Sequence, residues 1–374
     1  MSGLGAGGTW LYQLNATREC NLRCAHCYIS SDVKRASGRM RIEDLRSIAS
    51  GIAEHLDGLP GTTGELHVIG GEPTMLGFEW HEEAVAALRS SLTGRQHRLV
   101  LVSNLVSASP DETIRIAGLY DRVATSWEPS TRFSKPRQEE AWIGAVRRLR
   151  EAGIVPSVTT ALARPTVEAG ASSILSRLRD DFGFLHVHLG FFVPEGDGLA
   201  GGDAMFPSFA ATADFLIEAA EWYVARRDAD PELYVNPIEG VLDALASGER
   251  SDDVVCPMIS GSMDVDWDGS AAACLEVGGG SSPAWAGNVL RDGVAATAAS
   301  PAFSKARLAA MRLRRECASC PERGVCEGAC GVLQSRWDGT GEDCPGFRRF
   351  LRRVREFREA GVQPRSERAR TGCR

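Results

Sequence analysis

The chain has 374 residues, of which 43% are hydrophobic and 24% are charged, and this composition can bury one or two cores. A wholly disordered chain is therefore excluded. The formal net charge of −7 argues against general nucleic-acid binding, and no apolar run is long enough to span a membrane. The N-terminus shows no secretory signal, so the predicted compartment is the reducing cytoplasm. There, clustered cysteines are expected to bind metals rather than to form disulfides.

The first half of the chain alternates short β-like runs with helical patterns. The predicted strands are residues 10–14, 66–69, 99–102, 123–127, 154–162 and 185–193. The predicted helices are residues 41–57, 78–92, a short helix from residue 111, 137–152 and 171–181. Six β/α repeats predict a parallel sheet with right-handed crossovers. Because six strands are too few for a closed eight-stranded barrel, the predicted fold class is α/β, a partial (β/α)6 TIM-like barrel. Its functional site is expected at the carboxyl ends of the strands.

The second half changes character. Glycines at 196–202 indicate a boundary, and helical patterns at 208–227 and 237–247 form a bridge. Beyond it, short segments, glycines and cysteines predict a small domain with little regular structure, followed by a C-terminal helix. The predicted domains are residues 1–200, 201–253, 254–345 and 346–374.

The last 27 residues contain ten Arg and three Glu, although the whole chain is acidic. The apolar residues around the start of this stretch fall at helical spacing: Phe347, Phe350, Leu351, Val354 and Phe357. This pattern predicts an amphipathic helix that docks on the body of the protein, followed by a basic tail. The alternative is a basic docking surface for an acidic peptide or an electron donor.

Three of the 11 cysteines, Cys20, Cys24 and Cys27, follow the first predicted strand on one short loop. Iron–sulfur clusters usually take four Cys ligands, so three would leave one iron open, and an open metal position indicates chemistry rather than a purely structural site. The alternative is half of a zinc site that is completed elsewhere in the chain.

The C-x3-C-x2-C loop, together with Gly70, Gly71 and Glu72 after the next strand, resembles the radical S-adenosylmethionine (SAM) superfamily over residues 9–195. The resemblance implies a [4Fe–4S] cluster whose open iron binds the methionine part of SAM. One-electron cleavage then gives methionine and a 5′-deoxyadenosyl radical, which abstracts a substrate hydrogen. In this family the Gly-Gly-Glu element accepts the methionine amino group.

The same resemblance implies further SAM contacts. It places His26 against the adenine, Ser126 and Glu128 at the ribose, and Arg164 at the methionine carboxylate, which suits its bidentate guanidinium. Loop packing is the alternative for His26, and capping or surface roles are the alternatives for the other three residues. Asn104, at the end of the third strand, is interpreted as a turn residue.

Seven further cysteines lie near the C-terminus: Cys256, Cys274, Cys317, Cys320, Cys326, Cys330 and Cys344. Two CxxC-like pairs alone suit a zinc ribbon, but seven cysteines exceed one zinc site. Across residues 254–345 the spacing resembles the SPASM domain of peptide and sulfatase maturases. That resemblance implies two auxiliary [4Fe–4S] clusters, which gives three clusters in all.

By resemblance, Cys256, Cys274 and Cys330 hold the first auxiliary cluster, and the second is held by Cys317, Cys320, Cys326 and Cys344. Sulfatase-maturating members supply a fourth Cys to the first cluster, where this chain has Ser260, Ser262 and Met263. The missing ligand is another residue, Cys373 from the tail, or none, in which case one iron is open.

Glu276, two residues after Cys274, is the candidate catalytic base, because oxidising a substrate radical also requires a proton acceptor. In sulfatase-maturating members an Asp follows the corresponding Cys directly, so the match is offset by one residue. The alternative is a solvated Glu in a turn.

These features predict a radical SAM oxidoreductase that oxidatively modifies a peptide or protein by crosslinking, oxidation or epimerisation. The alternative is a small-molecule dehydrogenase or rearranging enzyme that acts on a sugar, aminocyclitol or nucleoside in natural-product biosynthesis. A non-catalytic iron–sulfur or zinc protein is disfavoured by the intact loop. The expected partners are the substrate and a flavodoxin- or ferredoxin-type electron donor. Because only 19 residues precede Cys20, a separate peptide-recognition protein is also expected, while no nucleic acid or membrane is expected.

Overall fold

Short parallel strands form the centre of the computed structural model, which describes residues 8–107, 109–248, 256–279, 284–310, 314–326, 328–341 and 343–365. One ten-stranded sheet runs in the spatial order β10-β9-β8-β1-β2-β3-β4-β5-β6-β7. Its strands are β1 (Thr9–Thr17), β2 (Thr63–Gly70), β3 (His97–Val102), β4 (Arg122–Ser126), β5 (Ser157–Ala161), β6 (His186–Gly190), β7 (Tyr234–Asn236), β8 (Ser262–Val265), β9 (Ser270–Ala272) and β10 (Gly287–Asn288).

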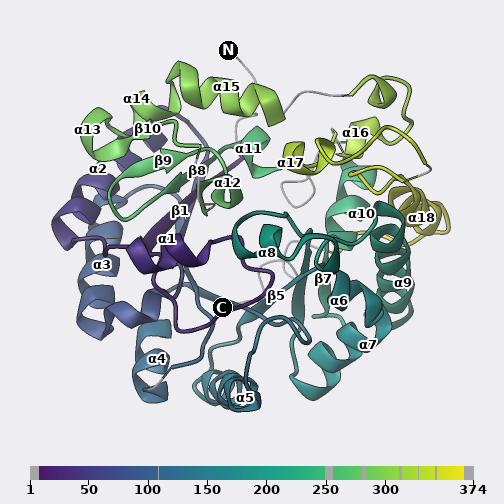
Figure 1. Cartoon of the computed structure of the whole chain (residues 1–374), viewed down its shortest axis with the longest axis horizontal. Helices are drawn as coiled ribbons and strands as arrows, with labels where there is room; N and C mark the ends of the chain where they lie inside the picture. Colours follow the sequence, from purple (N-terminus) through teal and green to yellow (C-terminus); the bar gives the residue numbers. More distant parts are fainter. Residues whose placement is uncertain are drawn as a thin grey trace.

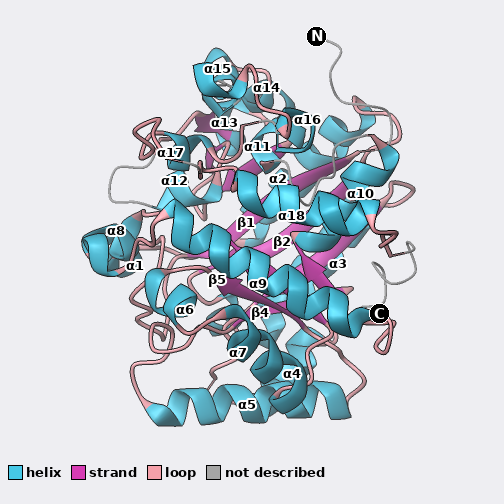
Figure 2. Ribbon diagram, turned by 90° about the vertical axis from the view of Figure 1, so that its right-hand side faces the viewer, coloured by secondary structure: helices cyan, strands magenta, loops and turns pink. Residues whose placement is uncertain are grey.

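Helices connect the parallel strands and cover the outer face of the sheet, as Figures 1 and 2 show. In the first part of the chain they are α1 (Ser31–Ala36), α2 (Ile42–Asp57), α3 (Phe78–Ser91), α4 (Pro110–Ala117), α5 (Pro136–Glu151), α6 (Arg164–Glu168), α7 (Ala171–Ser176), α8 (Gly196–Ala200), α9 (Phe209–Arg227) and α10 (Ile238–Ser247). The later helices are α11 (Pro257–Ser260), α12 (Leu275–Gly279), α13 (Val289–Asp292), α14 (Val294–Ala298), α15 (Pro301–Ala310), α16 (Arg323–Cys326), α17 (Gly331–Gln334) and α18 (Arg348–Glu359).

Burial follows the periodicity of each element. In α2, Leu45, Ile48, Ile52 and Leu56 recur on one face and are all buried in the core. In β2, buried Leu66 and Val68 alternate with half-buried neighbours, as expected for side chains that point to opposite faces of a sheet. In both elements the apolar residues therefore lie on the face that packs into the core, as the sequence periodicity predicts.

The predicted fold class is confirmed: the six predicted strands are present, pair in parallel in chain order and remain an open sheet. The structure extends this sheet at both edges. β7, from the segment interpreted as a helical bridge, pairs in parallel with β6. β8, from the cysteine-rich part, pairs in parallel with β1, with Leu11 opposite Ser262. The barrel and the cysteine-rich part therefore share one hydrogen-bonded sheet.

Beyond β8 the chain consists of short elements, seen in green and yellow in Figure 1. β9 pairs antiparallel with β8, and β10 pairs antiparallel with β9. Apart from α15, the helices between α11 and α17 are only four or five residues long. This agrees with the predicted cysteine-rich part with little regular structure.

α18 is the predicted C-terminal amphipathic helix, and it packs against α9 and α10 (Figure 1). Its apolar face is buried through Phe350, Leu351 and Val354. Its basic face pairs with acidic residues of the body: Arg349 with Asp214 and Asp343, Arg353 with Glu221, and Arg355 with Glu322. The helix is therefore docked, and these arginines already have intramolecular partners. None of the helices within the described ranges is long and apolar enough to cross a membrane.

Candidate functional site

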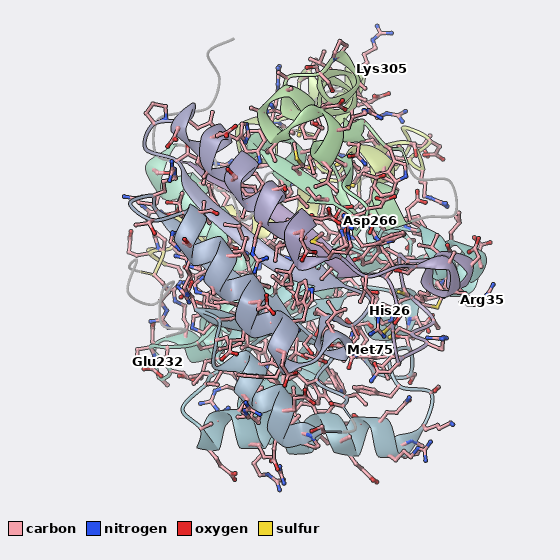
Figure 3. All side chains as sticks on the ribbon, turned by 90° about the vertical axis from the view of Figure 1, so that its left-hand side faces the viewer. His26, Arg35, Met75, Glu232, Asp266 and Lys305 are labelled. Carbon is pink, nitrogen blue, oxygen red and sulfur yellow. The ribbon has the colours of Figure 1, made fainter. Side chains whose placement is uncertain are left out.

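The loop that carries Cys20, Cys24 and Cys27 begins where β1 ends, at the carboxyl edge of the sheet. All three thiols are half-buried and free of disulfides. The backbone N–H of Ala25 donates to the carbonyl of Thr131 at 2.8 Å, and the N–H of Gly198 donates to the carbonyl of Cys27 at 2.9 Å. Segments that follow β4 and β6 therefore fix the loop from two sides. Figure 3 shows His26, in this loop, on the same side of the molecule as Met75, and Glu232 on the opposite side.

Gly70 and Gly71 are required by the close approach of β2 to the start of this loop. The N–H of Gly71 donates to the carbonyl of Thr17, and that of Glu72 to the carbonyl of Glu19, both at 2.8 Å. A Cβ on Gly70 would lie 1.9 Å from the Thr17 oxygen, and one on Gly71 would lie 2.1 Å from the Glu19 oxygen. Gly70 also has φ of 139°, which favours glycine. The two glycines therefore hold the cysteine loop against the second strand.

Glu72 is buried at the same edge, and its carboxylate accepts hydrogen bonds from residues that follow two strands, β2 and β3. Oε1 accepts hydrogen bonds from the Oγ1 and N–H of Thr74 at 2.7 and 3.1 Å and from the Ser103 hydroxyl at 2.8 Å. Oε2 accepts one bond, from the N–H of Asn104 at 2.6 Å. Burial raises the pKa of Glu72, and these hydrogen bonds oppose the rise. Because a carboxylate oxygen can accept more than one hydrogen bond, Oε2 retains capacity for an ammonium group.

Asn104 does more than form a turn. Its Oδ1 accepts from the N–H of Val106 at 2.8 Å, as in an Asx-turn, but its Nδ2 donates to Oδ1 of Asn21 at 2.8 Å. The same Nδ2 lies 3.7 Å from the Sγ of Cys20. The end of β3 is thus linked directly to the cysteine loop.

His26 and Glu128, which the sequence assigns to different parts of SAM, contact each other. The Nε2 of His26 lies 3.3 Å from Oε2 of Glu128, and its Nδ1 lies 2.9 Å from the Thr131 hydroxyl. Oε1 of Glu128 accepts from the N–H of Ala161 at 2.9 Å. Burial lowers the pKa of His26, which favours the neutral imidazole near pH 7.

Arg132 completes this group, and the sequence analysis missed it. Its Nη1 donates to Oε2 of Glu128 at 3.2 Å, and its Nε is buried without a partner. The guanidinium also lies near Cys24, where its charge opposes the effect of burial, which raises the pKa of that thiol to about 12. The signal in the sequence was the spacing of four residues from Glu128, but no motif marks it.

The other two predicted SAM contacts are less closely tied to the loop. Ser126 is the half-buried last residue of β4, opposite Thr159 of β5. The guanidinium of Arg164, at the start of α6, donates from Nη2 and Nε to the carbonyl of Phe206 at 3.0 and 3.3 Å. This contact holds Arg164 against the segment that precedes α9, and its role toward a carboxylate stays a prediction.

Lys34 is a second residue that sequence analysis missed. It is buried in α1, and its Nζ lies 2.9 Å from Oδ2 of Asp197. Burial alone would lower the pKa of Lys34, but the neighbouring Cys27 thiol and Asp197 raise it above its usual value. Asp197 also accepts the N–H and hydroxyl of Ser31, both at 2.8 Å. A positive charge therefore sits beside one of the three thiols, held by the segment interpreted as a domain boundary.

The C-terminal cysteines fall into two spatial sets. Four of them line one cavity: Cys317, Cys320, Cys326 and Cys344. Burial and the neighbouring thiols together raise the pKa of Cys326 to about 11. The sequence assigns these four thiols to one cluster, and the structure brings them together.

The second set contains Cys256, Cys274 and Cys330, with Glu276 beside them. The thiol of Cys274 donates to Oε2 of Glu276 at 3.1 Å. Burial raises the pKa of Cys256 to about 12, with smaller contributions from Cys330 and from Glu276. Burial also raises the pKa of Cys330, again with Glu276 contributing. Glu276 therefore contacts Cys274, and its role as a base stays a prediction. Cys373 lies outside the described residues.

A buried ion-pair group ties the cysteine loop to β8. Arg18, fully buried, lies 3.1 Å from Asp264 and 3.0 Å from Asp266. The Nδ2 of Asn15 also donates to Asp264. Burial raises the pKa of Asp264 to about 7, against the lowering effect of Arg18. The hydroxyl of Tyr28, which follows Cys27, is buried and lies near both Arg18 and Glu276.

The described residues contain no set of three or more His, Cys, Asp or Glu side chains gathered for a single metal ion.

Comparison with known proteins agrees with this geometry. Residues 14–168 match the model of the radical SAM superfamily. The fold is similar to that of anSMEcpe with bound AdoMet, at a TM-score of 0.76 and 16% identity over 94% of this chain and 97% of that one. Similarity to anSMEcpe with AdoMet and the Cp18Cys peptide gives a TM-score of 0.73 at 14% identity, over 95% and 97% of the two chains.

SuiB of Streptococcus suis bound to its precursor peptide SuiA is also similar. The TM-score is 0.60 at 15% identity, over 89% of this chain and 74% of SuiB. No curated protein sequence matches the chain. At these identities the structural matches show a shared fold.

Proposed function

We propose that this chain, whose residues 14–168 match the radical SAM superfamily, is an oxidoreductase that uses SAM to modify a peptide or protein. The observation that carries this proposal is the joining of the Cys20–Cys24–Cys27 loop to the Gly70-Gly71-Glu72 element at the carboxyl edge of a parallel sheet. Binding sites of parallel β/α folds lie at this edge.

The residues of the loop fit a [4Fe–4S] cluster with one open iron, because three thiols lie on one anchored loop. When bound, such a cluster supplies the electron that cleaves SAM to methionine and a 5′-deoxyadenosyl radical, which removes a substrate hydrogen. Oε2 of Glu72 would accept the SAM ammonium group. The group formed by His26, Glu128 and Arg132 would border the adenosyl part, with Ser126 at the ribose and Arg164 at the carboxylate.

Two further thiol sets support two auxiliary [4Fe–4S] clusters, and so three in all. Four cysteines share one cavity, and three others lie with Glu276 at a separate place. When bound, auxiliary clusters provide an acceptor for the electron that an oxidised substrate radical must lose. We propose a flavodoxin- or ferredoxin-type protein as the donor of the first electron and the reducing cytoplasm as the compartment.

A peptide substrate is supported by the relatives of similar fold. One anSMEcpe structure contains a peptide together with AdoMet, and SuiB is bound to the precursor peptide SuiA. A separate protein that recognises the precursor peptide is part of the proposal.

Anaerobic reconstitution followed by iron analysis and a SAM-cleavage assay with reductant tests this function. Three clusters correspond to about twelve irons per chain, and fewer than about eight would contradict the multi-cluster proposal. Deuterium transfer from labelled peptides into 5′-deoxyadenosine would identify the substrate. Transfer from labelled sugars or nucleosides, with none from peptides, would overturn the peptide assignment.

A further inference from the structure

The inner face of β4, β5 and β6 differs from the outer face. On the outer face, Val123, Val158 and Val187 are buried in the core, and Thr125 accepts a hydrogen bond from Trp142 of α5 at 3.0 Å. The residues that alternate with them point to the inner face, are half-buried or exposed, and are mostly polar. Solvent therefore reaches the inner face of these strands.

One row of polar residues crosses this inner face. Ser126 of β4 pairs in register with Thr159 of β5, which pairs with His188 of β6. His188 in turn pairs with Asn236 of β7. Because paired residues of neighbouring strands point to the same face, these four side chains line the inner face together. The row extends from the predicted ribose contact, Ser126, to a strand that the sequence did not predict.

His188 lies below the proposed SAM site and is open to solvent. All seven histidines lie within the described ranges, and His188 is the only exposed one. A Cβ on Gly190 would lie 3.7 Å from Cδ2 and 3.9 Å from Nε2 of His188, so the missing side chain leaves space beside the imidazole. Gly190 pairs with Ala161, whose N–H donates to Glu128. Being two residues before Gly190, His188 lies about 7 Å along the strand from the level of the Glu128 contact.

Asn236, the neighbour of His188, has a buried acceptor without a donor. The residue is 7% exposed, and its Oδ1 has no hydrogen-bond partner. Its position is fixed by the pairing of β7 with β6 and by the stacking of Tyr234 on His186, whose ring centroids are 5.8 Å apart. A buried oxygen without a donor is destabilising, so its presence beside an exposed imidazole indicates a binding site.

We propose that His188 and Asn236 bind an amide group of the substrate on the inner face, below the adenosyl part of SAM. An amide N–H can donate to Oδ1 of Asn236, and an amide oxygen can accept from the imidazole of His188. A neutral group suits the row, which contains no carboxylate, ammonium or guanidinium group. This inference rests on the proposed function and names the part of a peptide substrate that the barrel recognises.

Chemical footprinting tests this site without relying on catalysis. The full chain, reconstituted anaerobically and mixed with SAM, is treated with diethyl pyrocarbonate, and the modification of each histidine is followed by mass spectrometry. The probe is an equimolar mixture of N-acetyl amino acid amides, which carry the amide groups of a peptide. The probe should slow the modification of His188 about 5-fold at about four times its Kd. Modification of His97, at the start of β3, should not change.

Variants separate hydrogen bonding from the filling of space. His188→Leu removes both the donor and the acceptor, whereas His188→Gln keeps both. With the deuterated probe, the deuterium transferred into 5′-deoxyadenosine per SAM cleaved should fall about 10-fold in His188→Leu, because one hydrogen bond is lost. His188→Gln should return to within about 3-fold of the parent. His97→Leu is the matched control and should keep the parental ratio.

The outcomes separate this inference from the proposed function. If the probe does not protect His188, or if His188→Leu keeps the parental ratio, the inference is wrong and the proposed function stands. Protection by a mixture of sugars and nucleosides but not by the amides would overturn the amide assignment, as would a lack of deuterium transfer from the amides in the parent chain. If the parent chain cleaves no SAM, the proposed function fails, and footprinting alone decides this inference.

Discussion

The two cysteine regions are built in different ways. The loop of Cys20, Cys24 and Cys27 grows out of β1 and is held by backbone hydrogen bonds from the segments after β2, β4 and β6. The C-terminal thiols lie on or beside helices of four or five residues, such as α11, α12, α16 and α17. We therefore expect the sheet to form the first site before any metal binds, and we expect the C-terminal segments to depend on bound metal for their order.

The largest effect should come from breaking the contact that forms the first site. In Gly71→Ala the new Cβ meets two backbone oxygens, of Glu19 and Arg18, at 2.1 and 2.4 Å. Neither oxygen belongs to a flexible side chain, so the loop must move, and SAM cleavage should fall by about 100-fold or more, since such displacements of a reacting group are that costly.

Gly144→Ala is the control, because nothing lies within 4 Å of a Cβ at that helical position. It should leave cleavage unchanged and stabilise the helix by up to about 1 kcal/mol. Wild-type cleavage in Gly71→Ala would show that the loop tolerates movement and that the first site is not preformed.

The second prediction compares the two regions without metal. Limited proteolysis of the apo chain should cut residues 256–344 at least about 10-fold faster than residues 8–248, because metal binding supplies part of the folding free energy of small metal sites. Reconstitution should slow cleavage of residues 256–344 and leave cleavage of residues 8–248 nearly unchanged. Equal protection of both ranges in the apo chain would contradict the comparison.

A smaller effect is expected from Lys34, which places its charge beside Cys27. Lys34→Met keeps the length of the side chain and removes the charge, so the reduced, more negative state of a cluster at Cys27 becomes less favourable. The midpoint potential should fall by up to about 60 mV, a tenfold change for one electron, in an EPR-monitored redox titration. Because Asp197 also loses its partner, Asp197→Asn is the control. A potential that is lowered equally by both variants would assign the effect to the loop rather than to the charge.

The smallest effect concerns α18, which docks on the barrel through a buried face and exposed ion pairs. Arg353→Gln removes the half-exposed pair with Glu221 and should cost less than about 1 kcal/mol in urea unfolding. Val354→Ala, one residue on but fully buried, should cost more, about 1–3 kcal/mol. The reverse order would mean that charge, not the apolar face, holds the helix.

The long elements were predictable from the sequence because their periodicity runs over several turns or residue pairs. The helix predicted at 41–57 is α2, and the strand predicted at 66–69 is the centre of β2. β7, β8, β9 and β10 are two to four residues long, too short for any period, and exist because neighbouring strands offer a hydrogen-bonding edge. The thiols and the Gly-Gly-Glu element were also predictable, because their motifs are short local patterns in the sequence.

The remaining site residues depend on tertiary contacts. Arg132 belongs to the site because the packing of helices and strands brings the segment after β4 next to His26. Lys34 belongs to it because its partner Asp197 lies in the segment after β6. Neither contact is marked by a local pattern in the sequence. Glu276 was singled out by its distance from Cys274 along the chain, and in the structure its carboxylate contacts that thiol.

The parallel pairing of β1 with β8 has a consequence for electron transfer. The cysteine loop follows β1, while Cys256 precedes β8 and Cys274 follows β9, so a ladder of backbone hydrogen bonds sets the spacing between the two proposed clusters. Arg18 stabilises this strand pairing through its ion pairs with Asp264 and Asp266. A slip of one residue would change the spacing by about 3.3 Å. Since tunnelling between redox centres weakens exponentially with distance, the strand register would set the rate of electron transfer between the two proposed clusters.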